Sequence, residues 1–377
     1  MKQFEVNILV AGRTGCGKSA FVNYLYGAPV RDTGAGRPVT ERGLFCERLT
    51  LPDGVTLNVH DTWGMEPDRA AEWEALLLDE MEQRARGGVA DWFHTVFYCF
   101  SAASARVEDR ELTLLRHLMQ QGCQVLAVLT HCDAPGAPEA AKELRRVLTE
   151  GCGMDARDVL EVCSVEKTLL TGKTVRPFGR ERVLERLREG LWPSLRARCI
   201  ASLRAFAEGE VERWAELGEE LIARKVRFFN MLSPKLSDAL SDSLNRAAQG
   251  VMDEVQRRTS ALLSGCLDAY GCLMHLYGTP GVRVLAPELP AIEPLCCALT
   301  ASERSAYAFT AALLALIPVY NLAVPHKTLR ARRSEITLQL MKQRLNMLEQ
   351  LRLYLADVER TLLALRAEEI RDAGIFA

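Results

Sequence analysis

The stretch GRTGCGKSAFVNYLYG, residues 12–27, decides the fold of the first half of the chain. It follows directly on the apolar run FEVNILVAG, residues 4–12, in the order of a strand, a glycine-rich loop and a helix. Three glycines in eight residues let the backbone wrap closely, so that successive N–H groups point inward at an anion, and the helix N-terminus adds its dipole. The stretch therefore predicts a phosphate-binding loop, in which Lys18 reaches the terminal phosphates and Ser19 holds Mg²⁺.

The composition predicts a soluble, cytoplasmic protein. The 377 residues are 48% hydrophobic and 25% charged, and the formal net charge of −2 gives no support to a nucleic-acid partner. Twelve scattered cysteines without a CxxC pair favour free thiols in a reducing compartment, and the chain opens on a strand pattern instead of a secretory leader. The six histidines lack the spacing of a zinc site.

Residues 1–190 alternate short apolar runs with amphipathic stretches of helical spacing, such as residues 108–121 and 138–151. Strands that alternate with helices predict a doubly wound α/β fold with a mainly parallel, six-stranded sheet. Ligands of such sheets bind at the carboxyl ends of the strands. The predicted strands are FEVNILVAG (4–12), GLFCERLTL (43–51), VTLNVHDT (55–62), WFHTVFYCF (92–100), QVLAVLTHCD (124–133) and DVLEVCSV (158–165).

Residues 191–377 have long helical patterns with one interruption rich in proline and glycine, residues 278–294. They predict a separate all-α domain, with its boundary near residues 190–198. The last helical pattern carries a heptad seam that fits either an intramolecular bundle or a self-association stalk. The seam consists of Leu348, Leu351, Leu355, Val358, Leu362 and Leu365.

Residues 306–324, AYAFTAALLALIPVYNLAV, form the most apolar stretch of the chain. A membrane-spanning helix needs about 20 apolar residues, and this stretch contains Pro318 and Asn321, so a buried core helix is the leading interpretation. A membrane-inserting hairpin or surface anchor is the alternative, in which the following basic residues 326–333 meet anionic lipids. The adjacent Cys296–Cys297 pair fits two buried thiols better than a lipidation site.

Four further motifs follow the phosphate loop, and three of them lie at the ends of predicted strands. Each motif alone is common, but five motifs in a fixed order point to one kind of nucleotide site. The four are GRPVTERG (36–43), HDTWG (60–64), LTHCD (129–133) and VCSV (162–165).

Together these motifs resemble those of the P-loop GTPases of the translation-factor class, over roughly the first 180 residues. The likeness is greatest to Era-related and immunity-related GTPases, some of which have a helical C-terminal half. The resemblance implies a GTPase domain at residues 1–190 that binds GTP or GDP with Mg²⁺. It also implies that Ser19, Thr40 and Asp61 hold the metal, and that Thr40 and the Gly64 N–H face the γ-phosphate.

The resemblance further implies that Asp133 reads guanine, because its carboxylate accepts from two guanine N–H groups that adenine lacks. A solvated loop aspartate is the alternative interpretation. His131 stands where the family has a lysine along the base, and an imidazole can stack there instead. The expected nucleotide-binding residues are Gly12, Arg13, Thr14, Gly15, Cys16, Gly17, Lys18, Ser19, Ala20, Thr40, Asp61, Gly64, Thr130, His131, Asp133, Ser164 and Val165.

Lys18, Thr40, Gly64 and Arg13 are the candidate catalytic residues, since phosphoryl transfer needs positioning and neutralised charge. Met65 stands where Ras-like proteins have the glutamine that orients water, so we expect slow intrinsic turnover. The candidates for a charge-stabilising arginine are Arg13, Arg31, Arg37 and Arg42, with a solvated side chain as the alternative for Arg13. Cys16 is either an activated thiolate or simply a small loop residue.

These patterns predict a GTPase that acts as a nucleotide-controlled switch read out by the helical half. The alternatives are a dynamin-like or immunity-type GTPase that oligomerises at a membrane, a ribosome- or RNA-associated Era-like GTPase, and a non-hydrolysing scaffold. The expected partners are a guanine nucleotide, a second copy bound through the GTPase domain or the helical half, and in the second alternative a membrane surface. The expected location is the cytoplasm or the periphery of a membrane.

Overall fold

The computed structural model describes residues 5–27, 44–50, 56–62, 64–168, 174–227, 233–275, 289, 294–295, 297 and 323–372. The chain divides into two compact units. The first comprises Met1–Ser202 and Ala261–Val284, and the second comprises Leu203–Ser260 and Leu285–Ala377.

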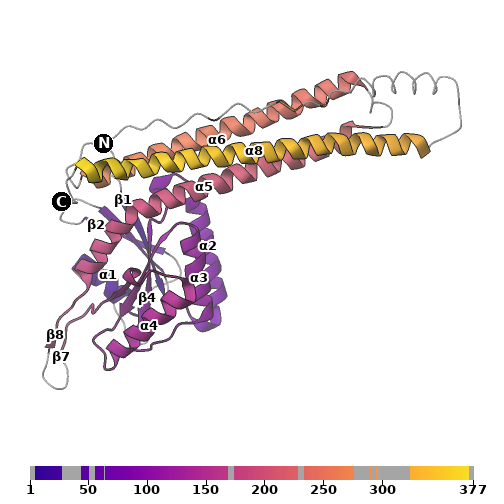
Figure 1. Cartoon of the computed structure of the whole chain (residues 1–377). Coiled ribbons are helices and arrows are strands. Elements are labelled where there is room, and N and C mark those ends of the chain that lie inside the picture. Colours follow the sequence, from indigo (N-terminus) through magenta and orange to yellow (C-terminus); the bar gives the residue numbers. More distant parts are fainter. Residues whose placement is uncertain are drawn as a thin grey trace, which may run out of the picture. The chain divides into compact units, whose positions relative to one another are not determined.

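A six-stranded sheet in the order β2-β3-β1-β4-β5-β6 forms the centre of the first unit (Figure 1). Only β2 and β3 pair in antiparallel fashion, whereas the other neighbours are parallel. The prediction of a mainly parallel, six-stranded sheet is therefore confirmed. The strands are β1 (Glu5–Gly12), β2 (Leu44–Thr50), β3 (Thr56–Thr62), β4 (Thr95–Ser101), β5 (Gln124–Thr130) and β6 (Val159–Glu161).

Two of these strands end earlier than the sequence pattern indicates. β5 stops at Thr130, three residues before the end of the apolar run, because His131 takes a positive φ of 56°. β6 stops at Glu161, and the chain then leaves the sheet to bridge Cys163 with Phe178. The sequence pattern did not indicate the small antiparallel hairpin of β7 (Lys167–Thr168) and β8 (Thr174–Val175) that follows.

Helices cover both faces of the sheet. One face packs against α2 (Ala70–Ala85), α3 (Asp109–Gln120) and α4 (Ala137–Cys152), which bury side chains such as Trp73 and Leu115 against Tyr98. The other face packs against α1 (Lys18–Tyr26), where the Phe21 ring meets Phe97 edge-on at 5.3 Å between centroids. Alternate side chains of each central strand thus enter opposite cores, as expected for a strand buried on both faces.

Three long helices contribute to the rest of the chain: α5 (Arg180–Lys225), α6 (Pro234–His275) and α8 (Ala323–Asp372). Their parts within the second unit enclose a core that includes Trp214, Leu244 and Leu340. This observation confirms the predicted helical C-terminal half. Residue 190, the predicted domain boundary, lies within α5, and the helix passes from the first unit into the second at residue 202. The division into domains at 1–190 and 191–377 stays a prediction.

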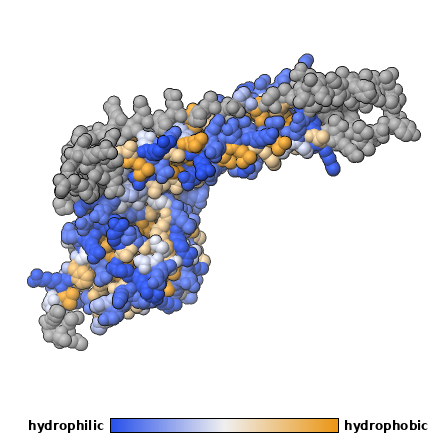
Figure 2. All heavy atoms as spheres, viewed as in Figure 1, coloured by the Kyte–Doolittle hydropathy of each residue, from blue (hydrophilic) through white to orange (hydrophobic). Residues whose placement is uncertain are grey.

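Four of the six seam residues of α8 are buried, Leu348 is partly buried, and the side chain of Leu365 is not among those that the structure describes. Leu351, Leu355, Val358 and Leu362 are at most 3% exposed, as expected of an intramolecular bundle. A second apolar stripe on the same helix, formed by Leu338, Met341 and Leu345, is about half exposed. Figure 2 shows such apolar side chains lying among hydrophilic ones along the helices.

Three sequence predictions fall mostly outside the described residues. They concern the apolar stretch at residues 306–322, the thiol of Cys296, and the segment that contains Arg31, Arg37, Thr40 and Arg42. Cys297 is 2% exposed, which agrees with the interpretation as a buried thiol. Among the helices that the structure describes, none has an apolar stretch sufficient to cross a bilayer.

His94 joins the start of β4 to β1 and carries no charge at neutral pH. Its Nδ1 accepts a hydrogen bond from the Asn7 backbone N–H at 2.8 Å, and its Nε2 lies 2.9 Å from the Val89 carbonyl oxygen, which fixes the Nε2–H tautomer. Burial lowers the pKa of His94 to about 4 against the opposing effect of the Val89 hydrogen bond, and the nearby Arg198 charge adds a smaller lowering.

We therefore predict that the His94 ring titrates near pH 4. Unfolded His binds its proton near pH 6.5, so the stabilisation from the neutral ring is complete above that pH and is lost as the pH falls toward 4. The pKa is measured by NMR titration of the histidine rings, with the resonance assigned by its loss in His94→Gln and with the exposed His117 as control. A His94 midpoint near 6.5 would contradict this assignment.

Candidate functional site

The glycine-rich loop lies between β1 and α1 and depends on backbone conformations that favour glycine. Gly12, Gly15 and Gly17 have φ values of 138°, 77° and 91°. A Cβ at Gly12 would lie 2.5 Å from the Cys99 carbonyl oxygen, so a side chain there would force the loop away from β4. Lys18 is 7% exposed, and its Nζ donates to the carbonyls of Gly12 at 3.1 Å and of Arg13 at 3.0 Å. The lysine is thus held over the loop.

The end of β5 is tied directly to this loop. The Thr130 hydroxyl donates to the Cys16 carbonyl and also lies 3.1 Å from the Phe100 carbonyl. His131 lies against the same loop, since a Cβ at Gly17 would come within 3.1 Å of its Nε2. Residues 130–133, the THCD part of the LTHCD motif, therefore contact the loop through Thr130 and His131.

The segment after β3 contacts the loop from the other side. Met65 N–H donates to the Gly12 carbonyl at 3.1 Å, and Thr14 N–H donates to the Met65 carbonyl at 3.1 Å. Gly64 lies so close that a Cβ there would sit 2.4 Å from Thr14 Oγ1. Asp61, at the end of β3, is fully buried. The end of the HDTWG motif, which has the form DxxG from Asp61 to Gly64, is thus in direct contact with the phosphate loop.

Met65 belongs to the hydrophobic core. Its side chain is 4% exposed and lies in the same cluster as Trp73, Leu77 and Tyr98. A thioether in a hydrophobic cluster cannot orient water. The sequence suggested that Met65 lacks this function, and the structure adds that its side chain is part of the packing under α2.

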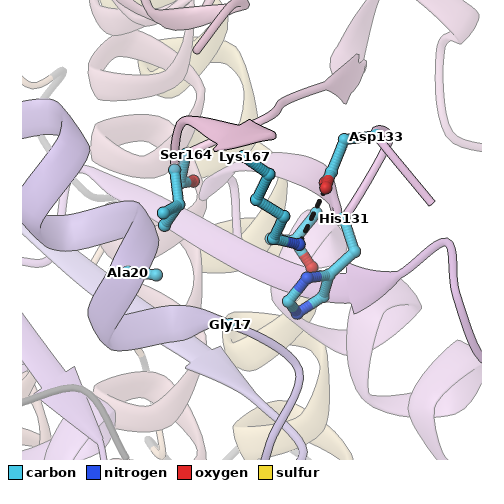
Figure 3. Close-up of a pocket in the computed structure, with 8 residues that line it drawn as sticks. Gly17, Ala20, His131, Asp133, Ser164 and Lys167 are labelled. Atoms are coloured by element: carbon cyan, nitrogen blue, oxygen red, sulfur yellow. Dashed lines mark ion pairs between the residues drawn. The ribbon is translucent and has the colours of Figure 1, made fainter. Parts of the chain in front are cut away.

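The phosphate loop, β5 and the segment after β6 converge on a pocket of about 80 Å³ (Figure 3). Seven of the eight residues that line it are among those expected from the sequence to bind nucleotide, and Lys167 is the exception. The lining residues are Gly17, Ala20, Thr130, His131, Asp133, Ser164, Val165 and Lys167. The structure therefore brings together residues that lie more than 140 positions apart in the chain.

Asp133 and Lys167 form an ion pair inside this pocket. Lys167 Nζ lies 2.7 Å from Asp133 Oδ2, and the Asp133 side chain is 5% exposed, whereas that of Lys167 is 46% exposed. Burial raises the pKa of Asp133, but the hydrogen bond and charge of Lys167 outweigh it, so that the pKa lies below the ordinary value. Burial, helped by the Lys167 charge, lowers the pKa of His131. The pocket therefore presents an ionised carboxylate beside a neutral imidazole.

The loop after β6 supplies a further polar group. The Ser164 hydroxyl is buried and has no hydrogen-bond partner among the residues that the structure describes. The two backbone hydrogen bonds between Cys163 and Phe178 hold this loop, and Gly179 lies where a Cβ would meet the Glu161 carbonyl at 2.3 Å. Ser164 thus remains available for a ligand in a fixed loop.

Arg13, a candidate catalytic residue, points to α3. Its guanidinium lies 2.8 Å from Glu111 Oε2 and 3.0 Å from Glu108 Oε1. Glu111 is 1% exposed and also accepts from the Tyr98 hydroxyl at 3.1 Å. Burial lowers the pKa of Arg13, yet the two carboxylates raise it overall, so the side chain stays charged in this network.

Cys16 is buried beneath the phosphate loop beside Cys99. A hydrogen bond from the Cys99 thiol, supported by the Lys18 charge, lowers the pKa of Cys16 against the effect of its burial. Cys16 is 5% exposed, so the thiol lies below the surface that faces the pocket. This position agrees with the simpler of the two interpretations, a small residue that lets the loop pack on β4.

The first unit combines the strand order β2-β3-β1-β4-β5-β6, one antiparallel edge pair, a phosphate loop after β1, DxxG after β3 and THCD after β5. This is the fold of a G domain of the P-loop GTPases. The fold is established by this topology and by the contacts of the motifs, and it does not select the Era-related class within these proteins.

Comparisons with known proteins find relatives over part of the chain. No family model matches the chain. Immune-associated nucleotide-binding protein 7 of Arabidopsis thaliana is 28% identical over 176 residues, which cover 46% of this chain and 55% of that protein. Translocase of chloroplast 90 from the same plant is 42% identical over 64 residues, or 17% of this chain and 8% of that protein. The chain thus spans about half of the first relative and a small part of the second.

Among solved structures, Toc33 of Arabidopsis thaliana in complex with GDP and Mg²⁺ is similar, with a TM-score of 0.36 and 21% identity. The alignment covers 49% of this chain and 82% of that chain.

Proposed function

We propose that the chain is a Mg²⁺-dependent GTPase that binds GTP and hydrolyses it to GDP and phosphate. The supporting observation is the pocket in which the phosphate loop, the THCD motif and Ser164 meet around the ionised Asp133. The order of these groups along the pocket suits a nucleotide whose phosphates lie on the loop and whose base reaches Asp133. We also propose, from the likeness of its motifs, that this activity belongs to the Era-related and immunity-related class of GTPases.

The phosphate chain would be held by the loop N–H groups and by Lys18. Lys18 Nζ already lies over the loop, where it donates hydrogen bonds to the Gly12 and Arg13 carbonyls. It would exchange these acceptors for phosphate oxygens when a nucleotide binds. The donor set also fits Mg²⁺, which prefers hard oxygen ligands. The Ser19 hydroxyl belongs to the first turn of α1, and the buried Asp61 carboxylate belongs to the second-last residue of β3. Bound Mg²⁺ would neutralise phosphate charge, with Thr40 as a further ligand in the proposal.

Lys18→Ala tests the phosphate site. In the described part of the chain, Lys18 is the side-chain cation that two carbonyls of the loop hold over it. The variant removes this cation, so we expect GTP binding to fall below detection. Binding is measured by isothermal titration calorimetry in magnesium-containing buffer. Lys142→Ala, an exposed position on α4, is the matched control. Unchanged affinity in Lys18→Ala would show that the phosphates bind elsewhere.

The proposed guanine preference depends on Asp133. Its carboxylate accepts from two N–H groups of guanine, and burying it against a base without those donors is costly. His131, held against Gly17 at the pocket wall, is placed to stack on the base in the role of the family's lysine.

Asp133→Asn should move the preference from guanine to xanthine nucleotides, because the amide offers a donor where the carboxylate accepted. We expect the variant to lose at least tenfold in GTP affinity, about the 1.4 kcal/mol that one charged hydrogen bond contributes, and to gain affinity for xanthosine triphosphate. Competition against a fluorescent nucleotide measures both. If the variant keeps the parent's order of preference, Asp133 does not read the base.

The proposed hydrolysis is slow in the isolated chain. Met65 is buried in the core and Arg13 is held by Glu108 and Glu111, so neither is placed to act on the reacting phosphate in this conformation. A group from outside these residues, such as one contributed by a second copy of the chain, would complete the catalytic site.

The proposed switch is read out along α5. Arg180, at the start of this helix, donates to the Leu25 carbonyl near the end of α1 at 2.9 Å and 2.8 Å, so α5 is attached to the helix that follows the phosphate loop. The same helix continues to Lys225 in the second unit. A shift of α1 on nucleotide binding would therefore act on a helix shared by both units.

Self-association is the second candidate property, supported by the exposed stripe of Leu338, Met341 and Leu345 on α8. If this stripe joins two copies, the mass in solution should double when GDP is replaced by a non-hydrolysable GTP analogue, and Leu345→Glu should prevent the change. Light scattering measures the mass. A monomer in both nucleotide states would contradict self-association. A GTP-dependent dimer that persists in Leu345→Glu would indicate that two copies join through the G domain instead of this stripe.

A further inference from the structure

The carboxylate proposed to read guanine is bound to a cation of its own chain. Figure 3 shows the Lys167 side chain extending from β7 across the pocket to Asp133. The Nζ–Oδ2 distance of 2.7 Å is that of a charge-assisted hydrogen bond. The low pKa of Asp133 agrees with a stable pair at neutral pH.

Lys167 and a base compete for space more than for lone pairs. A carboxylate has about four acceptor positions, so an ammonium group alone does not exhaust it. Lys167, however, lines the pocket together with His131 and Val165, and its Nζ lies 2.7 Å from Asp133 Oδ2, on the side of the carboxylate that faces the pocket. A purine that reaches Asp133 therefore has to displace the lysine side chain.

We propose that Lys167 is an internal competitor of the guanine edge: it holds Asp133 when no nucleotide is bound and recaptures the carboxylate as a nucleotide leaves. The inference rests on the proposed guanine site. It assigns Lys167 a positioning role, because the lysine acts on nucleotide binding through Asp133.

Two consequences follow for nucleotide exchange. The ion pair spares the nucleotide-free protein the cost of a buried, unpartnered carboxylate, so this form is stabilised relative to the bound form. The apparent affinity for nucleotide equals the intrinsic affinity multiplied by the fraction of molecules in which the pair is open. Lys167 is about half exposed, which limits the strength of the pair. The pair therefore favours release of nucleotide over retention by a modest factor.

The primary test compares Lys167→Met and Lys167→Arg with the parent by stopped-flow fluorescence of a labelled GDP. Lys167→Met keeps the length of the side chain and removes its charge, so we expect release to slow and affinity to rise on the order of fivefold. Lys167→Arg keeps the charge and can bind the carboxylate at two points, so it should bind GDP no more tightly than the parent. Lys142→Met, an exposed change on α4, is the matched control.

A double-mutant cycle isolates the pair. In Asp133→Asn the amide carries no charge for Lys167 to hold, so adding Lys167→Met should leave the affinity for xanthosine diphosphate unchanged within twofold. A change in that background equal to the change in the parent would show that Lys167 acts on nucleotide directly.

The outcomes separate this inference from the proposed function. Weaker GDP binding in Lys167→Met would overturn the inference and make the lysine a contact of the base, and unchanged binding would show that the pair does not compete. Equal effects of Met and Arg would exclude the charge as the cause. If the parent itself binds no guanine nucleotide, the proposed function fails, independently of how the variants compare.

Discussion

The close approach of the phosphate loop to the neighbouring strands is the constraint on which the site depends. Gly12 touches the backbone of β4 where no Cβ fits, and the Thr130 hydroxyl ties the Cys16 carbonyl to the end of β5. On the other side, backbone hydrogen bonds with Met65 fix the loop against the DxxG segment. A loop held from both sides points its N–H groups in fixed directions, and preorganised donors bind an anion without the cost of ordering them.

Two groups of ion pairs lie in this region, one around Arg13 and one around Asp133, and both involve residues expected to meet nucleotide. Arg13 is bound to Glu108 and Glu111 beside the loop, while Asp133 is bound to Lys167 in the pocket. In each group one carboxylate is nearly buried, so a ligand that displaces its cation must satisfy the carboxylate in turn. Charged groups of the proposed nucleotide site thus have internal partners, which links ligand binding to an exchange of partners.

The parts of the fold and site that the sequence predicted are those with a local signal. The loop spacing from Gly12 to Ser19 fixes strand, turn and helix together, and Thr130 to Asp133 end a continuous apolar run. Lys167 was missed because it lies in a two-residue strand that has no periodicity. Its position two residues after Val165, an expected nucleotide-binding residue, could have indicated that it lies near the site. The Arg13 network could not be predicted either, since it requires knowing that the start of α3 lies beside the loop.

The central claim is that one pocket selects guanine through Asp133 while the loop binds the phosphates. The most direct measurement is calorimetric titration of the unmodified chain with GTP, GDP and ATP in magnesium-containing buffer. The account predicts saturable, one-to-one binding of GTP and GDP and at least a tenfold weaker response to ATP. Equal binding of ATP and GTP, or no binding of either, would contradict it.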